Sequence, residues 1–323
     1  MLRTLLGLLL LVTSYSAFAA NVEKLAKGKW LHLATKDFEI ITDLNEKKAR
    51  ILMNDLEAYH FFLTEMMGTK LQPNLDPLPI LALGSSASFK HMGLPKTWAG
   101  VFRFRPDSYH AIANVDNYSD DLKKPSFGRQ VLLHEYSHFM QKFSLNRLPY
   151  PLWVQEGKAE YLGTFRFDGE KVYLGNPKAI MFRTYGLYSN SGMLNIDVEA
   201  TLKTKNLPMQ SQKMSDQTFV DTFYARSFFI MHYINSTPEL RASLVKYLQA
   251  VNEGKNEEDS LAIGFNQTFA EFEQSVTDYV INGLYMRVLS LRDGKVSFPV
   301  PEVKITKLDT EAFKAKIGIF LEE

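Results

Sequence analysis

The pattern of apolar and polar positions in the first half of the chain is typical of a sheet with one long helix. Over residues 45–67 apolar side chains recur at the three- and four-residue spacing of a helix, and Gly68 ends it. Short apolar runs around this segment predict strands. These runs are Phe38–Thr42, Leu78–Leu83, Gly100–Arg105 and His110–Val115, the last two joined at the turn Pro106-Asp107.

Helical periodicity dominates the second half, which contains one predicted hairpin, Thr164–Leu174, with Asp168-Gly169 at its turn. The predicted helices are Phe127–Phe143, Leu152–Gly163, Phe219–Asn235, Pro238–Val251 and Thr268–Tyr285. We therefore expect an α+β fold: a mixed-sheet N-terminal subdomain, residues 20–124, followed by a mainly helical subdomain, residues 125–290.

Residues 291–323 are predicted to form a linker and a terminal helix. Pro299 and Pro301 are typical of a linker, and Phe313, Ile317 and Phe320 form one apolar stripe beyond it. Such a stripe needs a packing partner. Two arrangements are open: the helix docks on the second half, or it opens a helical repeat in a longer parent protein and so offers a contact for a protein partner.

Residues 1–19 have the pattern of a signal peptide. Arg3 precedes an apolar run, Leu5–Val12, that is too short for a stable membrane anchor, and small residues at Ala17 and Ala19 suit cleavage after Ala19. A retained anchor is the alternative, although no longer apolar run or basic cluster supports it. We expect a periplasmic or secreted protein with no stable membrane anchor after cleavage.

Composition narrows the function classes. The 323 residues are 46% hydrophobic, enough for a substantial core, and the chain has no cysteine, so any metal must be held by His, Asp or Glu. Without the leader, whose only charged residue is Arg3, positive and negative side chains balance. No global field then favours nucleic acid or anionic lipid.

The segment Val131–His138, VLLHEYSH, carries the candidate chemistry. Its H-E-x-x-H pattern places His134 and His138 four residues apart, about 400° of rotation and about 6 Å of rise along a helix, so both imidazoles reach one ion. Glu135 lies about 100° around from His134, where it can serve as a base beside the metal. Burying these groups unpaired in an apolar run would be costly, which favours a metal site over an exposed polar face.

A third ligand is expected on the next helix, in the segment PLWVQEGKAEY. Glu156 follows His138 with 17 residues between them and is the candidate, because the positions for a short metzincin-type site hold Gln141 and Ser144. Glu160 lies one turn further on the same face and would accept a hydrogen bond from the free ring nitrogen of His134 or His138. Its alternative role is a solvated surface carboxylate.

Together with FYARSFFIMHYI at Phe223–Ile234, these motifs resemble the peptidase-MA-like domains of bacterial exported proteins, within the gluzincin zinc-peptidase superfamily. The resemblance covers about Trp30–Tyr285 and implies a zincin-like fold with the metal motif on the active-site helix. It also implies that Tyr224 steadies the oxyanion of the transition state; a core aromatic is the alternative. His232 is expected to be a satisfied core histidine. No G-x-M-E-N-like segment precedes the metal helix, so exopeptidase activity is not supported.

We therefore predict an exported zinc-dependent metallohydrolase, most simply an endopeptidase that cleaves peptide bonds through a zinc-bound water. Zn²⁺ is expected on His134, His138 and Glu156, with Glu135 and Tyr224 catalytic and Glu160 behind the ligands. The substrate would be a peptide or protein. The alternative is a non-catalytic, metal-bearing docking module of the cell envelope.

His110–Val115 is our candidate for the strand edge that pairs with an extended peptide. Natural substrate, cleavage preference, oligomeric state and membership of a longer repeat protein stay open.

Overall fold

The computed structural model describes residues 22–94, 99–145, 149–187, 194–208, 213–291 and 296–321. The predicted leader, residues 1–19, lies outside these residues. Within the described ranges, no helix is both long enough and apolar enough to cross a membrane. The fold is α+β with a mixed sheet, as expected from the two halves of the sequence pattern.

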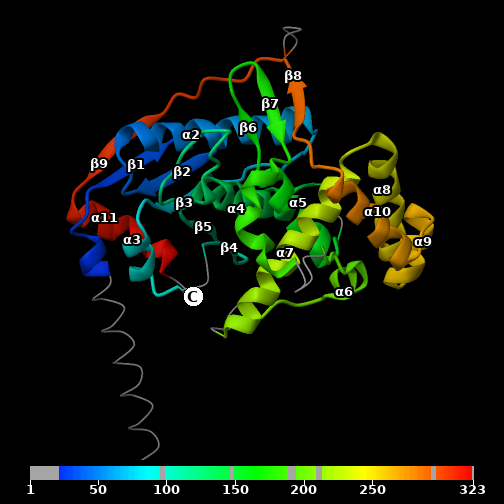
Figure 1. Ribbon diagram of the computed structural model, residues 1–323. Helices are drawn as coiled ribbons and strands as arrows, with labels where there is room; N and C mark the ends of the chain where they lie inside the picture. Colours follow the sequence, from blue (N-terminus) through cyan, green and yellow to red (C-terminus); the bar gives the residue numbers. More distant parts are fainter. Residues whose placement is uncertain are drawn as a thin grey trace, which may run out of the picture.

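A six-stranded sheet forms the first half of the molecule (Figure 1). The strand order is β4-β5-β3-β2-β1-β9; β2, β3 and β5 run parallel, and the other neighbours are antiparallel. The strands are β1 Trp30–Ala34, β2 Phe38–Thr42, β3 Leu78–Leu83, β4 Gly100–Phe104, β5 Tyr109–Asn114 and β9 Lys304–Leu308. The strands predicted from apolar runs are confirmed to within one residue at each end, whereas β1 and β9 were not predicted.

Helices cover the sheet and build the second half. Those of the first half are α2 Glu46–Phe61, its π-helical extension Phe62–Met66, and α3 Ser86–His91. Those of the second half are α4 Phe127–Phe143, α5 Leu152–Gly163, α6 Val198–Lys203, α7 Met214–Ile234, α8 Pro238–Asn252, α9 Glu257–Phe265 and α10 Phe269–Ile281. The predicted bounds of α4 and α5 are confirmed; α7 begins five residues earlier than predicted, and α9 was missed.

The long helix α2 packs on the sheet through the stripe that predicts it. Asn45 caps its first turn by accepting a hydrogen bond from the Lys48 amide. Leu52 and Leu56 are fully buried in the core that the sheet shares with α4. The π-helical turn then leads to Gly68, whose φ of 70° is a conformation that glycine adopts without strain. The helix ends where predicted, although its last turn is not α-helical.

The start of α4 is held tightly against the end of β5. A Cβ at Gly128 would lie 2.6 Å from the Val115 Cα, so only glycine permits this approach. One residue on, the buried guanidinium of Arg129 forms an ion pair with Asp55 of α2 at 2.8 Å and donates to the Phe165 carbonyl. These contacts fix the position of the helix that carries the H-E-x-x-H segment.

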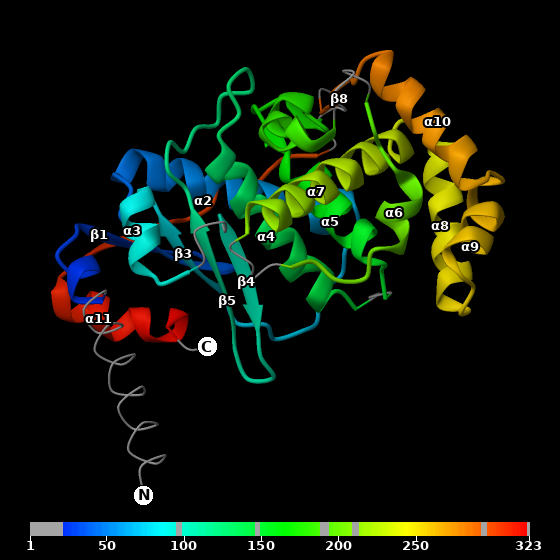
Figure 2. The same ribbon diagram turned by 60° about the horizontal axis from the view of Figure 1, so that its bottom comes forward.

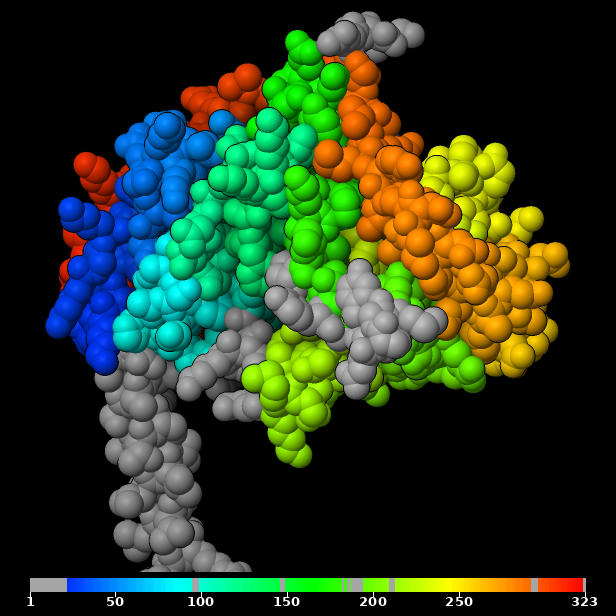
Figure 3. Space-filling model, viewed as in Figure 1, coloured from blue at the N-terminus to red at the C-terminus, as the bar shows by residue number. Residues whose placement is uncertain are grey.

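The C-terminal segment packs on the N-terminal sheet, not on the helical second half. Strand β9 pairs with β1, and helix α11, Thr310–Ile317, continues as the 3₁₀ turn Gly318–Phe320 against the same sheet. Phe313 stacks on Trp30 with ring centroids 4.3 Å apart. The two ends of the described chain therefore lie side by side, blue and red in Figure 3. Of the two arrangements left open, docking of the terminal helix on the second half is wrong, because β9 carries the helix back to β1.

The predicted hairpin in the second half is confirmed as β6 Arg166–Phe167 and β7 Lys171–Leu174, with Gly169 at a φ of 101° in the turn. A third strand, β8 Arg287–Ser290, pairs with β7 and returns the chain from α10. Helices α8, α9 and α10 form a group at the end of the molecule remote from β1 and β9 (Figures 1 and 3). Between these ends lie α4, α5 and α7.

Candidate metal centre

Helix α4 brings the two predicted imidazole ligands together. Ser126 caps the helix by accepting a hydrogen bond from the Arg129 amide, so the segment is helical from its first turn. The Nε2 atoms of His134 and His138 lie 3.0 Å apart. The His134 side chain is 9% exposed and the His138 side chain 21%, so the pair opens to solvent on the His138 side.

Helix α5 supplies the carboxylate. The Oε2 atom of Glu156 lies 3.3 Å from Nε2 of His134 and 3.3 Å from Nε2 of His138. This Oε2 is buried and has no hydrogen-bond partner among the described residues. Three ligand atoms from two helices thus converge on one point, and the group could hold a metal ion.

Two glycines let α5 approach its neighbours closely. A Cβ at Gly163 would lie 3.1 Å from the Gln130 carbonyl oxygen of α4, and one at Gly157 would lie 2.5 Å from the Ser227 carbonyl oxygen of α7. Helix α5 is therefore held between α4 and α7, and α4 is the helix that contacts β4 (Figure 2). This close packing places Glu156 within reach of the two imidazoles.

Glu160 lies behind the ligands, one turn beyond Glu156. Its side chain is 1% exposed, and its Oε1 lies 3.3 Å from Nδ1 of His134 and 3.2 Å from a guanidinium nitrogen of Arg183. Its Oε2 accepts a hydrogen bond of 2.9 Å from Gln130. The expectation of a carboxylate near a ring nitrogen agrees with this geometry, and the alternative of a solvated surface carboxylate does not.

The charges of these groups perturb one another. Burial on its own would lower the pKa of His134, but the carboxylates of Glu156 and Glu160 outweigh burial and raise this pKa to about 10. Burial on its own would raise the pKa of Glu156, yet His138 and His134 hold it well below its usual range. A carboxylate that stays ionised while buried is the protonation state that a metal ligand requires.

Glu135 lies between α4 and the sheet. A Cβ at Gly100 of β4 would lie 3.1 Å from its Oε1, and the Phe102 backbone gives the carboxylate a hydrogen bond. Burial raises the pKa of Glu135, and His134 and His138 oppose this rise. Glu135 is therefore beside the ligand triad, with a pKa shifted toward the range useful for proton transfer.

Tyr224 of α7 lies beside His134 of the triad. Its ring centroid is 5.9 Å from that of His134, and the Arg183 guanidinium stacks 4.5 Å from its ring. Burial, and then the negative charges of Glu156 and Glu135, raise the pKa of Tyr224 well above its usual value. The phenol therefore keeps its proton at neutral pH and can donate a hydrogen bond.

A cleft of about 520 Å³ opens on the His138 side of the triad. It is lined by Phe102 and Phe104 of β4, by His138, by Tyr150 and by Glu156, among others. The prediction that His110–Val115 offers the free strand edge is wrong, because β5 is hydrogen-bonded to β3 and to β4 on its two sides. The edge strand on this side of the sheet is β4, and it borders this cleft.

His232 is a satisfied core histidine, as predicted. It is 3% exposed, and its two ring nitrogens bond to the Gly175 carbonyl oxygen at 2.9 Å and the Tyr279 hydroxyl at 2.8 Å.

Sequence reasoning missed two residues that contact Glu160. Gln130 lies one turn before His134 on the same face of α4, so helical periodicity could have identified it. Arg183 lies in the 3₁₀ segment Met181–Leu187, where no periodicity or motif indicates its role. Arg183 also forms an ion pair with Asp221 of α7 at 2.9 Å, and so connects α5 to α7.

Comparison with protein-family models and with curated proteins finds no match to this chain. The family resemblance of its motifs is therefore an expectation that rests on the residues themselves.

Proposed function

We propose that this protein is an exported zinc-dependent metallohydrolase of the gluzincin type, acting as an endopeptidase. The spacing of the three ligand atoms carries the proposal. Ligands bound tetrahedrally to zinc at about 2.0–2.1 Å lie about 3.3 Å from one another. The three separations here are 3.0, 3.3 and 3.3 Å, so His134, His138 and Glu156 fit one zinc ion with little rearrangement.

Two imidazoles and one carboxylate favour zinc over calcium or magnesium, which prefer oxygen ligands. A zinc ion bound by three protein ligands would keep a fourth position open, polarise a carbonyl group there and lower the pKa of water. The cleft beside His138 and Glu156 gives a substrate access to that position. An extended peptide could add to the free edge of β4 through its backbone.

The side chains around the triad supply the remaining chemistry. Glu135 would accept a proton from the attacking water and later deliver it to the leaving amine, for which its raised pKa is suited. Tyr224 would donate its phenolic hydrogen to the developing oxyanion. Glu160 would hold the His134 ring in the orientation and tautomer that present Nε2 to the metal.

The test compares wild type with Glu135→Gln, and Glu253→Gln, an exposed site at the end of α8, is the matched control. We expect about one zinc per chain in all three proteins by metal analysis, because none of the changes touches a ligand. Hydrolysis of an unfolded protein substrate should fall by a factor of about 10²–10⁴ in Glu135→Gln, the usual contribution of a general base, and stay unchanged in the control.

Each outcome has a distinct meaning. A zinc content near zero in wild type would remove every metal-dependent function. One zinc per chain with no hydrolysis by wild type, and no difference from Glu135→Gln in any assay, would instead support a metal-bearing docking module. Loss of hydrolysis in Glu135→Gln with retained zinc would support the endopeptidase.

A further inference from the structure

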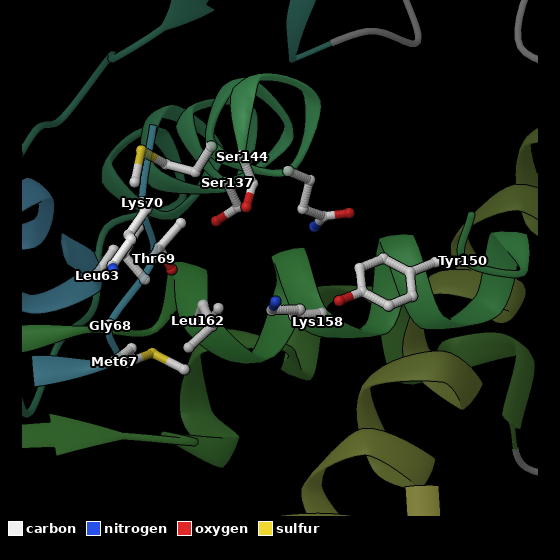
Figure 4. Close-up of a pocket in the computed structure, with 12 residues that line it drawn as sticks. Leu63, Met67, Gly68, Thr69, Lys70, Ser137, Ser144, Tyr150, Lys158 and Leu162 are labelled. Atoms are coloured by element: carbon white, nitrogen blue, oxygen red, sulfur yellow. The ribbon is translucent and has the colours of Figure 1, made fainter. Parts of the chain in front are cut away.

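A second hollow lies between α4, α5 and the segment that follows the π-helical turn, and we call it the Lys158 pocket (Figure 4). Its volume is about 180 Å³, well above the share of about 30 Å³ that one water occupies in the liquid. Lys158 of α5 and Tyr150 direct their polar ends toward its interior. The pocket therefore has room for an organic group of several atoms.

The charge in this pocket is unbalanced. Lys158 is partly buried, and no carboxylate of the described residues pairs with its amine; its nearest ring partner is Tyr150, with the amine 5.5 Å from the ring centroid. None of the described residues that line the pocket is acidic, and Lys70 adds a second amine at the rim.

The remaining walls are of two kinds. Leu63, Met140 and Leu162 form an apolar part, and the hydroxyl-bearing residues Thr69 and Ser144 lie on the polar part. An aliphatic stem suits the first part and an anionic head group suits the amine and the hydroxyls. No arginine lines the pocket within the described residues, which favours a singly charged carboxylate over a phosphate.

We propose that the Lys158 pocket is a binding site for a carboxylate on a short aliphatic stem. Two of its lining residues, Gln141 and Tyr150, also line the cleft that contains His138 and Glu156. The carboxylate could therefore be an acidic side chain of a peptide lying in that cleft, a source that rests on the proposed function. A free small organic acid is the other source, and binding of such an acid requires no hydrolysis.

The first experiment titrates the full-length, zinc-loaded protein with butyrate by calorimetry. Lys158→Met keeps the aliphatic stem and removes the charge, and Lys246→Met, at an exposed position of α8, is the control. We expect the dissociation constant to rise at least about tenfold in Lys158→Met, the usual effect of losing one charge-assisted hydrogen bond, and to stay unchanged in Lys246→Met. Butyrate bound to zinc would not respond to Lys158, so the difference between the variants reports the pocket.

A second measurement on wild type does not depend on how the variant folds. Neutral butyramide should bind at least about tenfold more weakly than butyrate. Equal binding of the acid and the amide, equal binding of butyrate by wild type and Lys158→Met, no binding of butyrate, or tighter binding of inorganic phosphate would each overturn the proposal.

A third measurement separates the two sources. Zinc-loaded Glu135→Gln is titrated with two peptides that differ only by Glu or Gln at one position, scanned along the peptide. A preference for Glu at one position that Lys158→Met abolishes would identify a peptide side chain as the ligand. Butyrate binding without such a preference would identify a free acid, and the carboxylate site would stand even if no hydrolysis were found.

Discussion

The most informative perturbation of the metal centre is Glu160→Gln, because it changes a charge without touching a ligand. The Glu160 side chain is 1% exposed, and the amide of the variant keeps the shape of the carboxylate. The amide has only one acceptor oxygen, however, so it cannot accept hydrogen bonds from all three neighbours of the carboxylate. Those neighbours are Nδ1 of His134 at 3.3 Å, Arg183 at 3.2 Å and the Gln130 amide at 2.9 Å. An amide nitrogen must then face at least one donor.

The magnitude follows from these contacts. Loss of a carboxylate partner behind a ligating histidine typically weakens metal binding about 10–100-fold. Loss of a buried, charge-assisted hydrogen bond costs about 1.5–3 kcal/mol, and Asp221 still pairs with Arg183, which keeps the effect on stability within that range. We therefore expect Glu160→Gln to bind zinc about 10–100-fold more weakly and to lose about 1.5–3 kcal/mol of unfolding free energy.

The assay is a zinc titration against a competing chelator, combined with urea unfolding of the metal-free proteins. The matched control is Glu302→Gln, an exposed carboxylate in the C-terminal segment, which should behave as wild type in both. If Glu160→Gln binds zinc as tightly as wild type, Glu160 does not orient His134, and the reasoning about the ligand shell is refuted. Weaker zinc binding in the control as well would indicate an effect of net charge alone.

Two further predictions concern stability. His110 is 4% exposed, and burial, together with the charges of Arg103 and Arg105, lowers its pKa to about 4. Because the pKa of His110 is lower in the folded state, the unfolded chain binds the proton first as the pH falls. The free energy of unfolding should therefore fall by up to about 3 kcal/mol between about pH 6.5 and about pH 4. In urea unfolding, this free energy should fall less with pH in His110→Phe than in wild type. Gly157→Ala should lower the unfolding free energy by about 1–3 kcal/mol, because its Cβ would lie 2.5 Å from a carbonyl oxygen of α7. Gly318→Ala, with nothing within 4 Å, should be neutral or stabilising, and equal effects of the two alanines in thermal unfolding would refute the packing argument.

The local parts of the site were predictable from the sequence. The i,i+4 spacing of His134 and His138 is a property of one helix, so their convergence needs no tertiary information. The bounds of α4 and α5 follow from apolar periodicity and from the prolines before α5. Glu156 could be selected because it is a carboxylate on the next helix, but its distance from the imidazoles depends on how closely α4 and α5 pack.

The non-local parts were not predictable in this way. The pairing of β1 with β9 joins segments from opposite ends of the chain, and neither strand has an apolar run as marked as that of β3. The periodicity of apolar residues does not show which strands pair with each other. For this reason β5 was mistaken for a free edge strand, although its continuous buried run over His110–Ala113 is typical of an interior strand. Arg183 reaches Glu160 from a 3₁₀ segment whose position depends on the whole second half.

The balance of charge explains why these groups can be packed together. Three carboxylates, those of Glu135, Glu156 and Glu160, surround the ligand point. The Arg183 guanidinium that pairs with Glu160 is shared with Asp221, so neutral imidazoles would leave negative charge uncompensated. Buried charge of this kind must be neutralised. Without metal, the site takes up a proton on His134, whose pKa is raised to about 10. A divalent cation would bring two positive charges to the carboxylates at once, and for that reason metal uptake near neutral pH should displace the His134 proton.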